Sequence, residues 1–432
     1  MHSGRCRRST RQAIPRRACC PTAEPPFSRK PFALFLRLTL IAALTAGAAH
    51  AATFDPSRPA VGPAKATQTA PVTYDSRAPF AFLMDADSGA VLYARSADER
   101  MPPSSMGKMM TTHVVFEMLK RGEVKLSDTV RVTADTWRAW NNRGSTMFLE
   151  VDEEVAIEDL LHGIVTLSGN DACVALAEGL MGTEAAFVAR MNETARRLGM
   201  KNSRFANTTG WPDPNEYVTP RDLAILARST INDFPDLYKR FYATPDYTRR
   251  LSSGKTIYQP NRNPILGLVR GADGLKTGHT EAAGYGFTGS AAQDGERLIM
   301  VVNGLTSEAE RRAESGSFLN WGFRAFERRT LVKAGQTVEQ VPVWLGAQET
   351  VPLVATRAVT TMVPRGSALQ TAPRLVYKGP IPAPVKAGQI VGTLELVQPG
   401  GGVLRVPVKA GADVAKAGLF GRIAAGFTSL FR

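Results

Sequence analysis

Cysteine and histidine are scarce in this sequence. Only four cysteines occur in 432 residues, and three of them lie within the first 20 positions. Four cysteines are too few for a disulfide-rich scaffold. The five histidines and the cysteines show no zinc-binding spacing. We therefore expect no metal and no cofactor.

Acidic residues are almost absent from the N-terminus, although the whole chain carries a net charge of +14. The first 51 residues hold nine Lys or Arg and a single acid, Glu24, followed by an apolar run (38–49) that ends in Ala49-His50-Ala51. A basic flank, a short apolar run and an A-x-A exit predict a secretory signal peptide over 1–51. The alternative is a basic arm that binds nucleic acid. Without this segment 44 basic and 38 acidic residues remain, a charge of +6, and no recognition motif for nucleic acid appears.

Removal of the signal peptide would leave Cys173 as the only cysteine, so the mature chain could form no internal disulfide. Cys173 lies in an apolar helical run and is interpreted as a packing residue. The remaining histidines are His113, His162 and His279. We interpret His113 as packing and His162 as structural or surface, so a Ser-His-Asp triad is not expected.

The middle of the chain predicts an α+β fold. Hydrophobic residues make up 44% and charged residues 21%, typical of a folded chain. After an Ala/Pro/Thr-rich stretch (52–73), interpreted as a flexible N-terminus, a hairpin is expected over Phe80–Tyr93, then helices to about residue 230, then a hairpin over Gly284–Leu305. Strands at both ends with helices between favour an antiparallel sheet with a helical insert. We assign 74–330 to this domain.

The last hundred residues change character twice. Short apolar runs separated by Gly and Pro predict a small all-β domain over 331–410, with these strands: Val338–Trp344, Val351–Val354, Ala358–Val363, Arg374–Tyr377, Ile390–Val397 and Val403–Val408. Residues 411–432 predict an amphipathic helix that lies in a membrane surface, because apolar residues share one face and Lys416, Arg422 and Arg432 add positive charge. The alternative is a terminal helix docked on its own domain.

A Ser-x-x-Lys motif offers a nucleophile. Ser105 and Lys108 stand at the start of an apolar helical run (109–119), with Ser104 as a candidate N-cap. Residues three apart lie on one helix face, so the lysine can reach the serine hydroxyl and act as its base if its pKa is lowered. The second Ser-x-x-Lys, at 252–255, lies in a polar loop and is interpreted as a chance match.

Two further triplets make the pattern specific. Ser-Gly-Asn occurs at 168–170 between helical runs, and Lys-Thr-Gly occurs once, at 276–278, just before the second hairpin. The three triplets in this order resemble the serine penicillin-recognising enzymes, the superfamily of penicillin-binding proteins and serine β-lactamases. The segments 205–222, 273–280 and 320–323 further resemble low-molecular-mass D-alanyl-D-alanine carboxypeptidases. The chain departs from that family at Met106-Gly107, in place of the usual Leu-Thr, and at Trp211, commonly Leu.

The resemblance implies the catalytic roles. Ser105 is the acylated nucleophile and Lys108 its base. Ser168 relays a proton to the leaving amine. Asn170 orients Lys108 and holds the substrate amide.

The resemblance also implies how substrate is bound. Lys276, in the triplet that ends at Gly278, keeps the site electropositive, and Thr277 hydrogen-bonds the terminal carboxylate of the substrate. The backbone N–H groups of Ser105 and His279 form the oxyanion hole. The expected second contact to the carboxylate is one of two neighbours, Arg311 and its close rival Arg312.

These observations predict a serine carboxypeptidase that removes the terminal D-alanine from peptidoglycan pentapeptides and is acylated by β-lactams. We expect it in the periplasm, attached peripherally to the inner membrane through 411–432. The alternatives are an endopeptidase that cuts cross-links, a β-lactamase, and a non-catalytic envelope scaffold. A β-lactamase of class A would need a glutamate that drives deacylation, and the stretch 211–216 lacks the expected pattern.

Overall fold

The computed structural model describes residues 73–251, 253–369 and 371–418. The predicted signal peptide and almost all of the predicted flexible N-terminus lie outside these residues, as does most of the predicted C-terminal helix. The described chain forms an α+β part (73–325) and a β part (326–418). Among the described residues no single helix is long and apolar enough to cross a membrane, and α4 (Asn170–Met181) and α5 (Glu184–Leu198) reach that length only together, across a 91° bend.

An antiparallel sheet of five strands forms the centre of the α+β part, in the order β2-β1-β9-β8-β7. Its strands are β1 (Phe80–Asp85), β2 (Val91–Arg95), β7 (Ala272–Thr280), β8 (Gly284–Gln293) and β9 (Glu296–Leu305). Both predicted hairpins are confirmed, and β1 pairs with β9, so the first and last segments meet as expected. The turn between β8 and β9 holds Asp294 and Gly295 at positive φ, which those two residue types tolerate.

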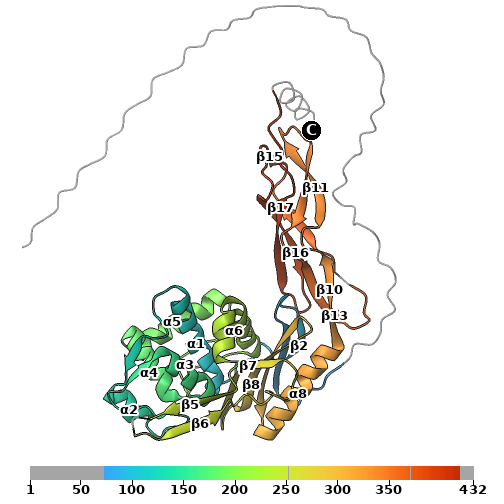
Figure 1. Cartoon of the computed structure of the whole chain (residues 1–432). Helices are drawn as coiled ribbons and strands as arrows, with labels where there is room; N and C mark the ends of the chain where they lie inside the picture. The colour runs from blue at the N-terminus through green and yellow to red at the C-terminus, as the bar shows by residue number, and fades with distance from the viewer. Residues whose placement is uncertain (1–72, 252, 370, 419–432) are drawn as a thin grey trace, which may run out of the picture. The chain divides into compact units, whose positions relative to one another are not determined.

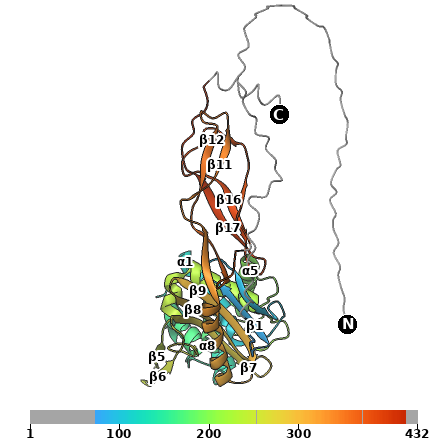
Figure 2. The ribbon, with the colours of Figure 1, turned by 90° about the vertical axis from the view of Figure 1, so that its right-hand side faces the viewer.

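Both faces of this sheet are covered. Because successive side chains of a strand point to opposite faces, the apolar run of β1 divides: Phe82 and Met84 pack with the helical insert, while Ala81 and Leu83 pack with α8 (Glu308–Ala325). Figures 1 and 2 show α8 along one face of the sheet and the remaining helices on the other. The helical insert is the part of the chain between β2 and β7, and it packs on one face of the sheet.

The insert contains most of the helices. They are α1 (Lys108–Lys120), α2 (Ala134–Trp140), α3 (Ile157–His162), α4 (Asn170–Met181), α5 (Glu184–Leu198), α6 (Pro220–Asp233) and α7 (Pro235–Phe241). A 3₁₀ turn (Ser104–Gly107) precedes α1, and a π-helical turn (Gly163–Leu167) follows α3. Two small antiparallel pairs of strands, which the sequence patterns did not predict, are β3 (Thr129–Arg131) with β4 (Glu154–Ala156) and β5 (Asp246–Arg250) with β6 (Thr256–Pro260).

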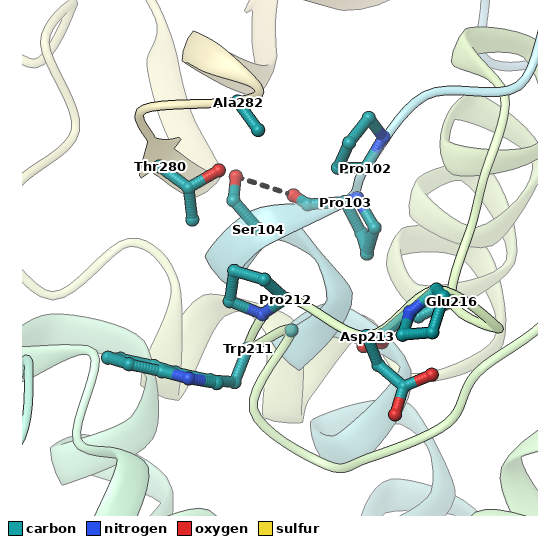
Figure 3. Close-up of a pocket in the computed structure, with 11 residues that line it drawn as sticks. Pro102, Pro103, Ser104, Trp211, Pro212, Asp213, Glu216, Thr280 and Ala282 are labelled. Atoms are coloured by element: carbon teal, nitrogen blue, oxygen red, sulfur yellow. Dashed lines mark hydrogen bonds between the residues drawn. The ribbon is translucent and has the colours of Figure 1, made fainter.

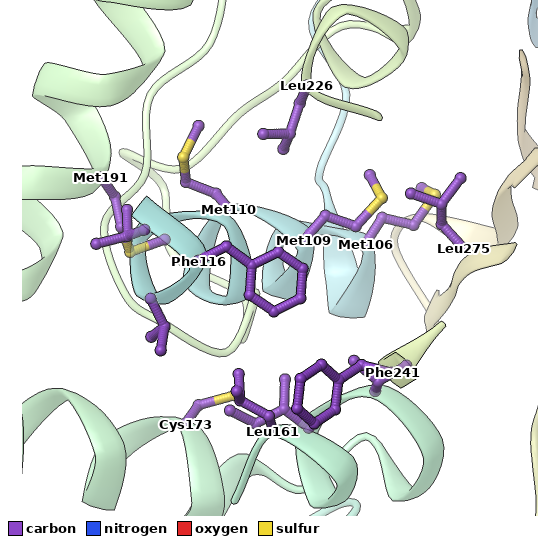
Figure 4. Packing of buried hydrophobic residues seen from close by; sticks show 14 of the residues in the cluster. Met106, Met109, Met110, Phe116, Leu161, Cys173, Met191, Leu226, Phe241 and Leu275 are labelled. Atoms are coloured by element: carbon purple, nitrogen blue, oxygen red, sulfur yellow. The ribbon is translucent and has the colours of Figure 1, made fainter. Parts of the chain in front are cut away.

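Helix α1 lies at the centre of the insert and is buried from Lys108 to Met118. A helix buried on all sides needs apolar neighbours all round, and Figure 4 shows them: Phe116 of α1 faces Leu161, Cys173 and Phe241 from surrounding helices, while Met109 lies on the other side of α1 near Met106. The buried setting predicted for Cys173 is confirmed. This packing fixes the start of α1 and with it the preceding 3₁₀ turn, which carries Ser105.

The β part contains the strands expected there. β10 (Phe326–Val332) pairs with β13 (Val359–Pro364), and a six-stranded sheet has the order β14-β16-β17-β12-β11-β15. Its strands are β11 (Thr337–Trp344), β12 (Thr350–Ala355), β14 (Arg374–Tyr377), β15 (Ile381–Pro382), β16 (Ile390–Val397) and β17 (Val403–Ala410). Alternating residues such as Leu404, Val406 and Val408 form its core. All six predicted strands are confirmed within two residues at each end.

Two predictions about helix ends are wrong. Residues 411–418 are not helical: Val414 and Lys416 make β-bridges to the β part, and Val414 is buried there, so the predicted C-terminal helix does not begin at 411. Ser104 is not an N-cap, because its Oγ hydrogen-bonds to the Pro103 carbonyl and its φ is +44°. The residues that would carry the rest of the C-terminal helix, 419–432, lie outside the described part.

Candidate active site

Ser105 and Lys108 meet at the first turn of α1. The Lys108 Nζ lies 2.9 Å from the Ser105 Oγ and also donates to the Thr209 carbonyl at 2.6 Å. Lys108 is 1% exposed. Burial lowers its pKa to about 8, since a charged amine is costly to desolvate. Near neutral pH a useful fraction of this lysine is therefore uncharged and able to accept the serine proton.

The second and third triplets meet each other across the same cleft. Ser168 ends the π-helical turn with φ +62°, and its Oγ accepts a hydrogen bond from the Lys276 Nζ at 3.0 Å. Lys276 lies on β7 and is 2% exposed. Burial, and then the positive charges of Lys108 and Arg262, lower its pKa well below the usual range. The two lysines therefore oppose each other's ionisation.

A cleft of about 260 Å³ joins these groups. It is lined by Ser105, Ser145, Ser168, Arg262, Thr277, Gly278, His279, Tyr285, Glu308 and Arg311. Arg311 is buried in the wall, whereas Arg312 is exposed and is not among the lining residues. The cleft thus offers a hydroxyl nucleophile at one point and guanidinium groups at another.

Sequence patterns did not identify Arg262 as a site residue, because it lies in an irregular segment without a motif. Its Nη1 donates to the Ser145 Oγ at 2.8 Å. Burial lowers the pKa of both Arg262 and Arg311, the latter despite its 3.0 Å ion pair with Glu308. The Nε of Arg311 has no hydrogen-bond partner within the described residues. Two partly desolvated guanidinium groups in one cleft form a strong site for a carboxylate.

Glycine is needed where β7 passes the 3₁₀ turn Ser104–Gly107, which carries the nucleophile Ser105 and is called the nucleophile turn below. A Cβ on Gly278 would lie 2.2 Å from the Ser104 Oγ and 3.1 Å from the Met106 nitrogen. Gly210, at φ +74°, approaches the same turn from the other side, and its Cβ would lie 1.8 Å from the Ser104 carbonyl oxygen. Backbone contact on both sides holds Ser105 in place, which compensates for the flexibility of Gly107.

The imidazole of His279 is not aimed at the nucleophile. It stacks on Tyr285 at 3.8 Å between ring centroids, and its Nδ1 lies 3.2 Å from the Gly284 carbonyl. His113 is buried and contacts the Thr230 hydroxyl at 2.8 Å, as expected of a packing residue. His162 stacks on Tyr247. No described histidine is placed to serve as the base of a Ser-His-Asp triad.

The Asn170 side chain binds the backbone of the turn that carries Arg143. Its Nδ2 donates to the Arg143 carbonyl at 3.3 Å, and no hydrogen bond joins it to Lys108 in this structure. The partner of Lys108 is instead the carbonyl of Thr209, which sits in a turn organised by Asn207: the Asn207 Oδ1 accepts from the backbone N–H groups of Thr209 and Trp211. Sequence reasoning missed this role because a backbone carbonyl leaves no side-chain signature.

Glu216 supports the same turn. Its Oε2 accepts a hydrogen bond from the Asn207 Nδ2 at 2.6 Å, and burial raises its pKa to about 8. Glu216 lines a separate pocket of about 220 Å³ with Ser104, Trp211 and Thr280 (Figure 3). Among the described residues no group of three or more His, Cys, Asp or Glu could hold a metal ion.

Comparison with known proteins accounts for nearly all of the described chain. A model of the peptidase S11 family, D-alanyl-D-alanine carboxypeptidase, matches residues 64–307, and one of the penicillin-binding protein 5 C-terminal domain matches 326–416. The chain is 37% identical over 390 residues to D-alanyl-D-alanine carboxypeptidase DacC of Escherichia coli, covering 89% of this chain and 94% of the relative. It is 36% identical to DacF of Bacillus subtilis, covering 78% and 86%.

A solved structure of penicillin binding protein 5 from Haemophilus influenzae is also similar. It aligns with a TM-score of 0.69 and 35% identity, covering 80% of this chain and 99% of the other.

Proposed function

This chain belongs to the D-alanyl-D-alanine carboxypeptidase family and is a serine-type carboxypeptidase, and on that premise we propose that Ser105 is the residue that it acylates. The observation that carries the proposal is the 2.9 Å contact between Ser105 and Lys108 at the edge of the cleft. The proposed substrate is the peptidoglycan pentapeptide that ends in two D-alanines. β-Lactams would acylate the same hydroxyl.

Acylation begins with a proton transfer. Uncharged Lys108 takes the proton of Ser105, and the Oγ attacks the carbonyl of the penultimate D-alanine. The C–N bond then breaks, and the proton reaches the departing amine by way of the Ser168 hydroxyl, which Lys276 contacts at 3.0 Å. Lys108 is again uncharged and can take a proton from the water that hydrolyses the acyl-enzyme. The backbone N–H groups of Ser105 and His279 are the proposed donors to the oxyanion.

The terminal carboxylate of the substrate explains the cations of the cleft. We assign its contacts to the Thr277 hydroxyl and to Arg311, with Arg262 as an additional cation on the same wall. A free carboxylate is the group that distinguishes a carboxypeptidase substrate from an internal peptide bond. Guanidinium groups recognise it through paired N–H donors.

The test is the variant Ser105→Ala. It is expected to lose both D-alanine release from a pentapeptide and labelling by fluorescent penicillin, because among the described residues no other hydroxyl is hydrogen-bonded to the Lys108 Nζ. The chance Ser-x-x-Lys motif provides a matched control in Lys255→Ala, which changes an exposed lysine and is expected to keep both activities. Labelling retained by Ser105→Ala would refute the assignment.

Slow deacylation of penicillins is the further expectation. Glu216 is hydrogen-bonded to Asn207 and is not among the residues that line the cleft of Ser105, so no carboxylate is offered there as a base for water other than Glu308, which pairs with Arg311. We therefore expect a long-lived penicilloyl adduct, observable by mass spectrometry of the intact protein. Rapid turnover would favour the β-lactamase alternative.

We also propose export and membrane attachment. The basic and apolar composition of 1–51 supports cleavage by a signal peptidase, and the apolar and basic residues of 419–432 support a peripheral anchor. A chain ending at 418 keeps the buried Val414 and Ala417 and is expected to move from the membrane fraction to the soluble periplasm. An unchanged distribution would contradict the anchor.

A further inference from the structure

Three side chains form a cluster beside the cleft that the proposed mechanism does not use. Trp140 ends α2, Arg143 follows in the next turn, and Trp211 follows Gly210. The two indole rings are 5.6 Å apart between centroids at an interplanar angle of 80°. The Arg143 guanidinium carbon lies 5.2 Å from the centroid of the Trp140 ring and 5.0 Å from that of Trp211. Each ring attracts the cation through its negatively polarised face.

The guanidinium in this cluster has no anionic partner. Arg143 is exposed, and within residues 73–251, 253–369 and 371–418 its side chain forms neither an ion pair nor a hydrogen bond. Arg138, on the preceding helix, differs because it pairs with Asp135. The two rings are nearly perpendicular, so the planar guanidinium can lie flat on at most one of them, and its contacts with the rings leave N–H donors at its edge. Arg143 is therefore held in place by two rings while its donors remain available.

The cluster is joined to the catalytic cleft through backbone. The Arg143 carbonyl accepts from the Asn170 Nδ2. A Cβ on Gly144 would lie 2.8 Å from both that nitrogen and the Trp211 ring. Ser145, the next residue, lines the cleft and accepts from Arg262. The turn that carries Arg143 thus forms one continuous surface with the cleft wall.

Trp211 also connects the cluster to the nucleophile. It lines the 220 Å³ pocket with Ser104 and Thr280, whereas the cleft is lined by their chain neighbours Ser105 and His279. Figure 3 shows Trp211 extending from the loop that faces the Ser104 turn. Gly210, the residue before Trp211, lies against the Ser104 carbonyl. A peptide that has its terminal carboxylate at the cleft cations and its carbonyl at Ser105, and that leaves the cleft past this turn, would therefore meet Trp211.

The charges at this boundary place an anion at Arg143 rather than in the pocket. Asp213 lines the pocket together with four prolines, so the carboxylate of Asp213 would repel a second carboxylate there. Arg143 is the cation that contacts the Trp211 ring. The two sides of Trp211 thus present opposite charges.

We propose that Trp140, Arg143 and Trp211 form a subsite that binds a carboxylate of the peptide on the acyl side of the cleaved bond. The proposal deepens the proposed function and rests on it. Preorganisation by two rings lowers the entropy lost on binding, and the guanidinium edge supplies paired donors to a carboxylate. The subsite would select acidic donor peptides without taking part in bond making.

The test uses two pentapeptides that end in D-Ala-D-Ala and differ only in an upstream carboxylate, which is free in one and amidated in the other. Arg143→Ala is expected to lower kcat/KM about tenfold for the free acid, the loss of one charge-assisted contact, and to leave the amidated peptide within about twofold. Arg143→Lys keeps the charge without the planar stack and is expected to lie between.

The matched control is Arg138→Ala, which removes an exposed arginine of the same region that lies outside the cluster and the cleft. It is expected to match the wild type on both peptides. Acylation by benzylpenicillin, whose side chain is uncharged, should be unchanged in Arg143→Ala, which shows that Ser105 and Asn170 remain in place.

Two outcomes would overturn the subsite: no loss in Arg143→Ala with the free acid, or an equal loss with the amidated peptide and with benzylpenicillin. The second would mean that Arg143 only supports the fold. A wild-type protein that releases no D-alanine and takes no penicillin would instead refute the proposed function, and the subsite with it.

Discussion

The α+β part and the β part of this molecule bury different kinds of side chains. The α+β part buries the charged groups Lys108, Lys276 and Arg311 beside its cleft. Among the described residues of the β part, the only buried polar side chains are Thr361 and Gln398, which hydrogen-bond to each other at 2.6 Å. The rest of that core is aliphatic.

The buried charges of the α+β part serve its chemistry, whereas the apolar core of the β part serves its stability. A buried charge is costly unless it is paired, and burying an amine lowers its pKa. The α+β part tolerates that cost where an uncharged lysine is useful. The described residues of the β part bury no charged side chain, and its core follows from the alternation of apolar and polar residues along each strand. A substitution in the catalytic site should therefore change the reaction rate and leave the β part stable, and a substitution in the core of the β part should do the reverse.

The largest effect is expected from Lys108→Ala. Removing the base should lower the rate of penicillin acylation on the order of 10³-fold or more, measured with fluorescent penicillin in excess over protein. Lys255→Ala, in the exposed Ser-x-x-Lys motif, should react at the wild-type rate. Equal rates in the two variants would show that burial of Lys108 has no part in the chemistry.

Gly278→Ala should have the next largest effect. Its methyl group cannot fit 2.2 Å from the Ser104 Oγ, so β7 or the nucleophile turn must shift by roughly 1 Å, which can cost about 10²-fold in rate. The measurement is kcat/KM for D-alanine release, with far-ultraviolet circular dichroism to show that the fold is retained. Wild-type kinetics in a folded variant would contradict the close approach of the two elements.

Leu396→Ala tests the β part. Leu396 is fully buried on β16, so its truncation should destabilise the β part by about 2–5 kcal/mol without changing acylation of the folded protein. Its neighbour Val397 is 55% exposed, and Val397→Ala should have a small effect. Urea unfolding followed alongside penicillin labelling distinguishes the two. A loss of acylation before the β part unfolds would show that the parts are not independent.

The smallest effect is expected from Glu216→Gln. The Glu216 charge raises the pKa of Lys108, and it develops only as pH approaches about 8, the pKa of Glu216. Because the active form of Lys108 is uncharged, acylation should rise as pH increases through about 8. Without the Glu216 charge the pKa of Lys108 is lower, so the variant should reach its plateau at a lower pH.

The curves for Glu216→Gln and the wild type should coincide at acidic pH, where Glu216 is protonated in the wild type. Rate constants for acylation between about pH 6 and 10 provide the measurement. A plateau displaced to higher pH would contradict the assigned sign. Glutamine can still accept from Asn207, so the turn that holds Lys108 is preserved.

Sequence patterns were most informative where structure is periodic. Strands such as Ile390–Val397 and Arg374–Tyr377 were predicted to the residue, since alternation and Gly/Pro boundaries act locally. The strand pairs β3–β4 and β5–β6 were not predicted, because β3 and β4 are only three residues long and β5 and β6 are mostly polar. The role expected for Asn170, to orient Lys108 and hold the substrate amide, stays a prediction, because among the described residues its Nδ2 donates only to the Arg143 carbonyl.

Local chemistry in the sequence already indicated the two hairpins of the central sheet, the six predicted strands of the β part and the proximity of Ser105 and Lys108, since residues three apart on a helix are neighbours. Only the tertiary structure decided that Arg311 rather than Arg312 enters the cleft, that Arg262 joins it, and that Thr209 holds Lys108. The contacts of Lys108 with Thr209 and of Arg262 with Ser145 join residues 101 and 117 positions apart in the sequence. Contacts between such distant residues depend on tertiary packing, which no local sequence pattern encodes.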